Sequence, residues 1–141
     1  MSSVTIPSTP ARSRGLHVTL WVVQVALGAA YGAAGFMKSL QPIPALAAMM
    51  HWPGDVPEWL VRFIGIAELA GAVGLILPAL LRIAPRLTTL AAGGLALIQV
   101  LAIPFHLARG EAEMLPVNLV LLALAVFVIW GRSRKAPILP R

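Results

Sequence analysis

Residues 59–81 read W-L-V-R-F-I-G-I-A-E-L-A-G-A-V-G-L-I-L-P-A-L-L and are apolar almost throughout. A helix that crosses a hydrocarbon layer about 30 Å thick needs about 20 apolar residues, each adding 1.5 Å. Only Arg62 and Glu68 carry charge in this run. The run therefore predicts a helix that spans a membrane.

Three more segments have the length and apolar character of a span, at residues 17–37, 87–107 and 114–130. The links R-I-A-P-R (82–86) and A-R-G-E-A-E (108–113) are short, so the helices on either side of each should be antiparallel neighbours. The longer first loop, 38–58, contains P-A-L-A-A-M-M-H-W, which favours a short helix lying in the interface. The expected fold is an all-α integral membrane four-helix bundle.

The composition of the 141 residues supports this class: 59% are hydrophobic and only 11% are charged. Soluble domains carry about 25% charged residues, so an ordinary soluble enzyme is excluded. The net charge of +6 does not indicate a nucleic-acid partner, because the basic residues lie between long apolar runs. With no cysteine, the chain alone forms no disulfide, thiolate nucleophile or Fe–S site.

The distribution of Lys and Arg predicts that both termini face the cytoplasm, in a multi-pass protein of the inner membrane. In that orientation eight of the 11 basic residues lie on the inner side and three on the outer side. The inner ones are Arg12, Arg14, Arg82, Arg86, Arg132, Arg134, Lys135 and Arg141; the outer ones are Lys38, Arg62 and Arg109. We expect three regions: a mobile tail (1–15), a membrane domain (16–131) and a basic cytoplasmic tail (132–141).

Polar residues inside the spans need a reason, because a charge near the bilayer centre costs about 2.5–3.5 kcal/mol. Glu68 is the strongest case, and we expect Arg62, six residues earlier, to neutralise it. Lys38, His106 and Asn118 fall in the same outer half of the predicted bundle. All four spans thus contribute a polar residue to one region.

The first span carries a stripe of small and polar residues at helical spacing, namely Gln24, Gly28, Tyr31, Gly35 and Lys38. Such a stripe should face other helices, because lipid-facing surface needs neither small nor polar residues. Gly28 and Gly32 form a G-x-x-x-G pair that permits close approach. The polar stripe is therefore expected to face Glu68.

Structural explanations remain open for each of these residues. Glu68 could fix helix packing through an ion pair, and His106 could merely cap the bundle. Lys38 and Arg62 could extend to the lipid headgroups, while Gln24 and Asn118 could join helices by hydrogen bonds. The sequence contains no nucleotide-binding or hydrolase motif, and its three histidines and five acids show no metal-ligand spacing, so no metal site is predicted.

The chain resembles the DoxX-like family of small four-helix bacterial membrane proteins. The resemblance is carried by R-x-x-G-x-x-E-L-x-G-x-x-G-L-x-L-P (62–78), with weaker support from Q-V-A-L-G-A-A-Y-G-A-A-G-F-M-K (24–38), I-P-F-H-L (103–107) and P-V-N (116–118). It implies a link to membrane redox complexes, because the founding member is a subunit of a thiosulfate:quinone oxidoreductase. The family's polar positions correspond to Lys38, Arg62, Glu68, His106 and Asn118.

Our hypothesis is a redox-associated accessory subunit with a quinone or another lipophilic ligand in the outer half of the bundle. In it Glu68 and His106 exchange protons, Arg62 holds the charge of Glu68, and Asn118 and Tyr31 donate hydrogen bonds, with Gln24 also near the ligand. Membrane lipid, redox enzyme subunits and a second copy of the chain are the expected partners. The alternatives are a non-catalytic assembly or lipid-binding scaffold, and a small proton-coupled exporter, which the uneven Lys/Arg distribution disfavours.

Overall fold

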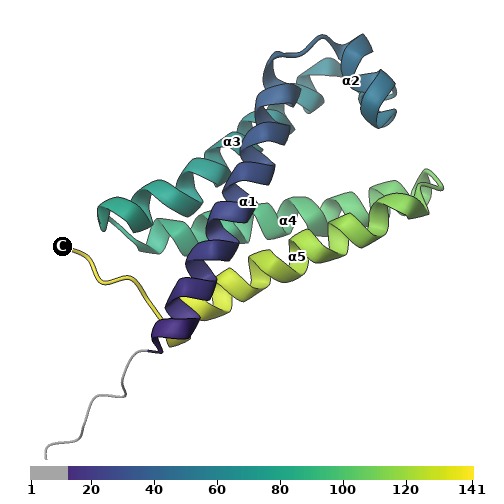
Figure 1. Ribbon diagram of the computed structural model, residues 1–141. Helices are drawn as coiled ribbons and strands as arrows, with labels where there is room; N and C mark the ends of the chain where they lie inside the picture. Colours follow the sequence, from purple (N-terminus) through teal and green to yellow (C-terminus); the bar gives the residue numbers. More distant parts are fainter. Residues whose placement is uncertain (1–12) are drawn as a thin grey trace, which may run out of the picture.

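A computed structural model describes residues 13–141, and within that range the chain is helical without a strand. Figure 1 shows the helices α1 (Arg14–Leu40), α2 (Ile43–Met50), α3 (Glu58–Leu81), α4 (Arg86–Ala108) and α5 (Leu115–Trp130). Short turns η1 (Trp52–Gly54), η2 (Ala112–Met114) and η3 (Gly131–Lys135) complete the described chain. Four helices are long and apolar enough to cross a membrane: α1, α3, α4 and the continuous run Ala112–Lys135. The predicted all-α bundle with four spans is confirmed.

The predicted bounds are close to the observed ones, and the main differences lie at the two ends of α1, which extends three residues beyond the predicted span 17–37 on each side. Ser13 caps this helix by accepting a hydrogen bond from the Leu16 N–H at 3.3 Å, so the helix begins at Arg14. Helix α1 thus begins within the segment predicted as the N-terminal tail (1–15), of which residues 1–12 lie outside the described residues. The short helix expected in the first loop is confirmed as α2.

Helices α1 and α3 cross where each carries a glycine. A Cβ atom at Gly35 would lie 2.7 Å from the carbonyl oxygen of Gly65, closer than side-chain carbons approach such atoms. Around Gly28 the fit is looser, with the nearest atom of Ile76 at 3.1 Å from such a position. The closest approach therefore lies nearer the end of α1 than the G-x-x-x-G pair predicts.

The surface around the four long helices is largely apolar, whereas the polar side chains in their middle sections are buried. Exposed large residues include Val22, Phe63, Leu90 and Leu101, each more than 60% accessible. Buried polar residues include Gln24, Glu68, Gln99 and Asn118. This inversion of the soluble pattern suits a protein whose solvent is lipid, where polar groups must find partners inside the bundle.

The bundle has two unlike ends. The first described residue and the C-terminus lie at one end, here called the termini end, together with the turn between α3 and α4 (Figure 1). The other end, the loop end, holds α2, η1 and the turn between α4 and α5 (Figure 1). The C-terminal segment 132–141 folds back onto the termini end, where the N–H of Arg141 donates to Arg82 O at 3.1 Å.

Candidate functional site

Lys38 and Glu68 form a buried ion pair in the half of the bundle nearer the loop end. The Nζ atom of Lys38 donates to both carboxylate oxygens of Glu68, at 2.8 Å and 3.0 Å. The residues are 9% and 3% accessible, so the pair has little contact with its surroundings outside the protein. The expected pairing of Arg62 with Glu68 is therefore wrong.

Arg62 instead holds the end of α1. Its Nη1 donates to the carbonyl oxygens of Lys38 at 2.9 Å and Gln41 at 2.7 Å, and its Nη2 donates to Glu58 at 2.9 Å. Six residues turn a helix by about 600°, so Arg62 and Glu68 point about 120° apart around α3. Across the helix crossing, Lys38 is the cation that this carboxylate meets.

The direction of helical side chains explains why Lys38 and Glu68 meet. Side chains tilt toward the N-terminus of their own helix, and α1 and α3 are antiparallel neighbours. Lys38, near the end of α1, therefore leans into the bundle, while Glu68 leans toward the loop end. Gly65 leaves room for this approach, since a Cβ there would lie 2.8 Å from Cβ of Lys38.

The indole ring of Trp52 connects the ion pair to the other hairpin. Nζ of Lys38 lies 5.8 Å from the centre of this ring, and the ring of Phe105 packs edge-on against it at 6.0 Å. Phe105 is followed by His106, which is itself 6% accessible. Trp52 was missed because its proline-rich loop gives no periodic pattern; only the apolar run before it hinted at a packed segment.

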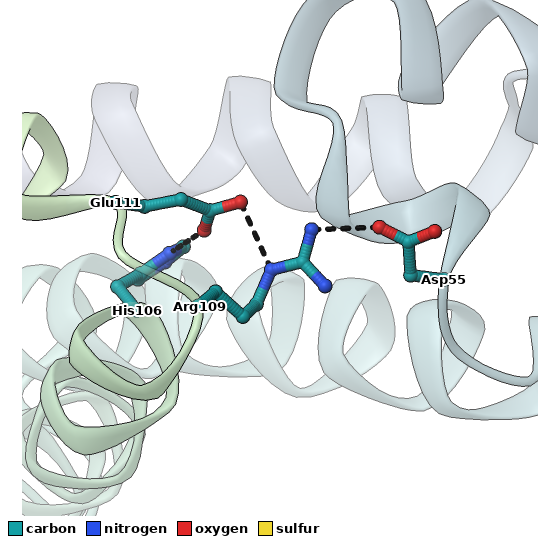
Figure 2. A network of polar contacts seen from close by, with 4 residues as sticks. All are labelled: Asp55, His106, Arg109 and Glu111. Atoms are coloured by element: carbon teal, nitrogen blue, oxygen red, sulfur yellow. Dashed lines mark hydrogen bonds and ion pairs between the residues drawn. The ribbon is translucent and has the colours of Figure 1, made fainter.

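Beyond His106, a chain of charged groups ties the two loops together (Figure 2). Nδ1 of His106 lies 2.7 Å from one oxygen of Glu111, and Nε of Arg109 donates to the other at 2.9 Å. The same guanidinium donates through Nη2 to Asp55 at 2.7 Å, beside η1. Glu111, Arg109 and Asp55 were not expected in the site, because sequence showed them only as loop charges.

The contacts of Glu111 predict a stability that depends on pH. The hydrogen bond with His106, and then the hydrogen bond and charge of Arg109, hold the pKa of Glu111 below its usual 4.5, against the opposing effect of desolvation. A carboxylate with a lowered pKa stabilises the fold above its unfolded value and loses this contribution as pH falls through the folded value. We expect Glu111→Gln to lower the thermal midpoint near neutral pH, with the difference from wild type vanishing in acid.

The measurement is a series of thermal unfolding curves in detergent between about pH 3 and pH 7. Glu113→Gln is the matched control, because Glu113 is exposed and takes no part in the network of Figure 2. A Glu111→Gln profile parallel to wild type at every pH would show that the network does not hold the loops.

Tyr31, Gln99 and Asn118 place further polar groups in the bundle. Nε2 of Gln99 donates to the hydroxyl oxygen of Tyr31 at 2.7 Å. The other amide atom of Gln99, Oε1, and Nδ2 of Asn118 are buried and have no hydrogen-bond partner within residues 13–141. Buried polar atoms are seldom left unpaired, so one acceptor and one donor remain available here.

Gln24 lies outside the group of polar residues in the loop-end half. Its Nε2 donates to Leu75 O at 2.6 Å and its Oε1 accepts from Nε of Arg132 at 2.6 Å. Arg132 belongs to the termini end, so Gln24 faces inward as its stripe predicts but is not near Glu68. Gln24 and Lys38 share one face of α1, but they lie at different heights along the helix axis and so belong to different ends of the bundle.

The membrane region of the chain matches a known protein family. The family model described as "DoxX-like family" matches residues 22–128. The chain belongs to the DoxX-like family. No curated protein and no solved structure matches it. The family match and the four long apolar helices make it a multi-pass integral membrane protein.

The DoxX-like match covers the residues of the loop-end half, including Tyr31, Lys38, Glu68, His106 and Asn118. Arg132 and the folded C-terminal segment lie outside it. Within residues 13–141 no group of three His, Asp or Glu side chains is placed to hold a metal ion. The available chemistry is therefore a buried ion pair, a histidine paired with a carboxylate, and two unpaired amide atoms.

Proposed function

We propose that this DoxX-like protein is a redox-associated accessory subunit that binds a quinone or a similar lipophilic ligand in the loop-end half of the bundle. The observation that carries the proposal is the pair of unpartnered buried atoms, Nδ2 of Asn118 and Oε1 of Gln99, in the half that also holds Lys38–Glu68. The Lys/Arg distribution supports placing this half toward the outside of the inner membrane.

The residues fit a quinone better than they fit a wholly apolar ligand. The amide N–H of Asn118 donates, which suits a carbonyl oxygen, and Oε1 of Gln99 accepts, which suits a hydroxyl. Tyr31 orients Gln99, because its hydroxyl oxygen holds the amide nitrogen of that side chain. A bound quinone would supply two-electron chemistry coupled to protons.

For the proposed quinone chemistry, this chain's own residues would supply the groups that carry protons and balance charge. Lys38 and Glu68 form a paired ammonium and carboxylate, so the pair stays neutral when Glu68 takes up a proton only if Lys38 releases one. His106 lies nearer the loop end and contacts Glu111, which is 17% accessible at its side chain. We propose that His106 and Glu111 connect the buried pair to water.

Electrons must come from another subunit, because the sequence contains no cysteine and no known cofactor motif. The proposed partner is therefore a redox enzyme of the membrane. The scaffold alternative differs in one respect: it needs the ion pair for packing but no ligand at the amide atoms.

The test is mass spectrometry of quinones extracted from protein purified in a mild detergent, with wild type, Asn118→Leu and Gln99→Met compared. Loss of one hydrogen bond of about 1 kcal/mol should lower the quinone retained per protein by about fivefold. Thr88→Val is the matched control, since Oγ1 of Thr88 is equally buried and unpartnered but belongs to the first turn of α4, at the termini end.

Retention that falls in both amide variants and survives in Thr88→Val supports the proposed site. Wild-type protein that carries only lipid, or quinone retention unaffected by either amide, rejects it and favours the scaffold. If quinone is retained, Glu68→Gln then tests proton transfer: full activity of the partner complex with this variant would eliminate that role for Glu68.

A further inference from the structure

A second site lies at the termini end, far from the proposed quinone site. A cavity of about 340 Å³ opens there between the start of α1, the end of α3 and the C-terminal segment. It is lined by His17, Trp21, Ala79, Leu80, Arg82, Ile138 and Leu139. Its volume is at the lower end for small-molecule pockets, so it suits a compact group.

The C-terminal segment forms one wall of this cavity because it is held at two points. Nη1 of Arg132 donates to Ala136 O at 3.1 Å where the segment leaves η3. Farther on, Nε of Arg82 donates to Leu139 O at 2.8 Å and Arg82 O accepts from the N–H of Arg141 at 3.1 Å. Figure 1 shows this segment running from the end of α5 toward the turn between α3 and α4.

The lining changes character along the membrane normal. Arg82 follows the last residue of α3, where a span meets the headgroups, and its side chain is exposed. Leu80, in the last turn of α3, and Trp21, two turns into α1, present apolar surface to the cavity. A cation at the level of the headgroups above an apolar wall matches the order of phosphate and acyl chain in a phospholipid.

Charge at this end favours an anion. The described residues of the termini end include seven basic side chains: Arg14, Arg82, Arg86, Arg132, Arg134, Lys135 and Arg141. All five acids of the chain lie elsewhere, with Glu68 inside α3 and Asp55, Glu58, Glu111 and Glu113 at the loop end. Within residues 13–141 the cavity therefore has cationic neighbours and no acidic side chain at the same end.

We propose that this cavity binds the headgroup phosphate of an anionic phospholipid, with Arg82 as its main cation and residues 138 and 139 as one wall. Arg82 donates to the C-terminal segment through Nε, and its two Nη groups have no acceptor among residues 13–141. A guanidinium anchored at one nitrogen is well oriented to hold a phosphate with the other two. The lipid would thereby fasten the C-terminal segment to the bundle.

The experiment is native mass spectrometry of the full chain released from micelles that contain equal amounts of phosphatidylglycerol and phosphatidylcholine. Both lipids carry a phosphate, but the choline cation of phosphatidylcholine offsets its charge and would meet the basic side chains of this end. We expect wild type to prefer phosphatidylglycerol by about tenfold, and Arg82→Gln to lose that preference. Arg86→Gln is the matched control, because it removes one exposed cation from the same end without touching the cavity lining.

Two outcomes of the lipid experiment would overturn the proposal. Equal losses in Arg82→Gln and Arg86→Gln would mean diffuse attraction to a basic surface, and displacement of the lipid by millimolar inorganic phosphate would mean a free-anion site; both overturn it. If Arg82→Gln lowers the thermal midpoint in the absence of lipid, the loss of preference could reflect misfolding. A chain that ends at Pro137 then tests whether the cavity is the lipid site. This variant keeps Arg82 and removes the wall, and an unchanged lipid preference would reject the cavity as the site.

Discussion

Glu68→Leu is expected to lower the free energy of unfolding by about 3–5 kcal/mol, the usual cost of removing one partner of a buried ion pair. Lys38, 9% accessible, would be left as an unpaired cation in the bundle. Its ring contact with Trp52 at 5.8 Å does not replace the two carboxylate oxygens at 2.8 Å and 3.0 Å. The measurement is the thermal or denaturant midpoint in detergent.

The double variant Lys38→Met with Glu68→Leu supplies the decisive comparison. Replacing both charges by apolar groups of similar size is often neutral or stabilising, so most of the lost stability should return. The cycle of two single variants and the double variant isolates the interaction between the pair. A double variant that is stable yet no longer retains quinone would separate function from packing, whereas additive losses would mean that the two residues do not interact.

Most of the fold follows from the sequence because the membrane leaves few options. A backbone in lipid must satisfy its own hydrogen bonds, so each apolar run long enough to cross becomes a helix. The run at 59–81 needed one residue at its start to match α3, and the run at 87–107 needed one residue at each end to match α4. The start of α1 was missed because a single side chain, Ser13, fixes it through a hydrogen bond.

Partners of the site residues could not be predicted because they depend on how helices cross. Periodicity gives the direction in which a side chain points around its helix, and it says nothing of which neighbour lies there. Gln24 and Lys38 share a face of α1, yet 14 residues separate them by about 21 Å along the axis. A shared stripe therefore placed them in one site, and the structure puts Gln24 with Arg132 and Lys38 with Glu68.

The cavity at the termini end could not be predicted from the sequence, for a related reason. A short basic segment after the last span is typical of a free tail, and hydropathy carries no information about its return path. Its course depends on Arg82, whose φ of 57° turns the chain sharply after α3. Two backbone-directed contacts of this one residue then hold the segment.

The crossing of α1 and α3 leads to the second large effect, which concerns Gly35. A methyl group there would meet the Gly65 carbonyl oxygen at 2.7 Å and the Leu69 nitrogen at 2.8 Å. Both are backbone atoms and cannot turn aside, so Gly35→Ala must push the helices apart. We expect it to lower the free energy of unfolding by about 2 kcal/mol, although alanine itself favours the helix.

Gly94→Ala is the matched control for Gly35→Ala, because a Cβ at Gly94 meets nothing within 4 Å and the residue is exposed. It should raise stability by up to about 1 kcal/mol through helix propensity alone. The crossing also sets the distance over which Lys38 reaches Glu68, so part of the cost of Gly35→Ala should disappear in a chain that already lacks both charges. Equal costs with and without the ion pair would show that the crossing and the pair are independent, and that Gly35 does not position the candidate site.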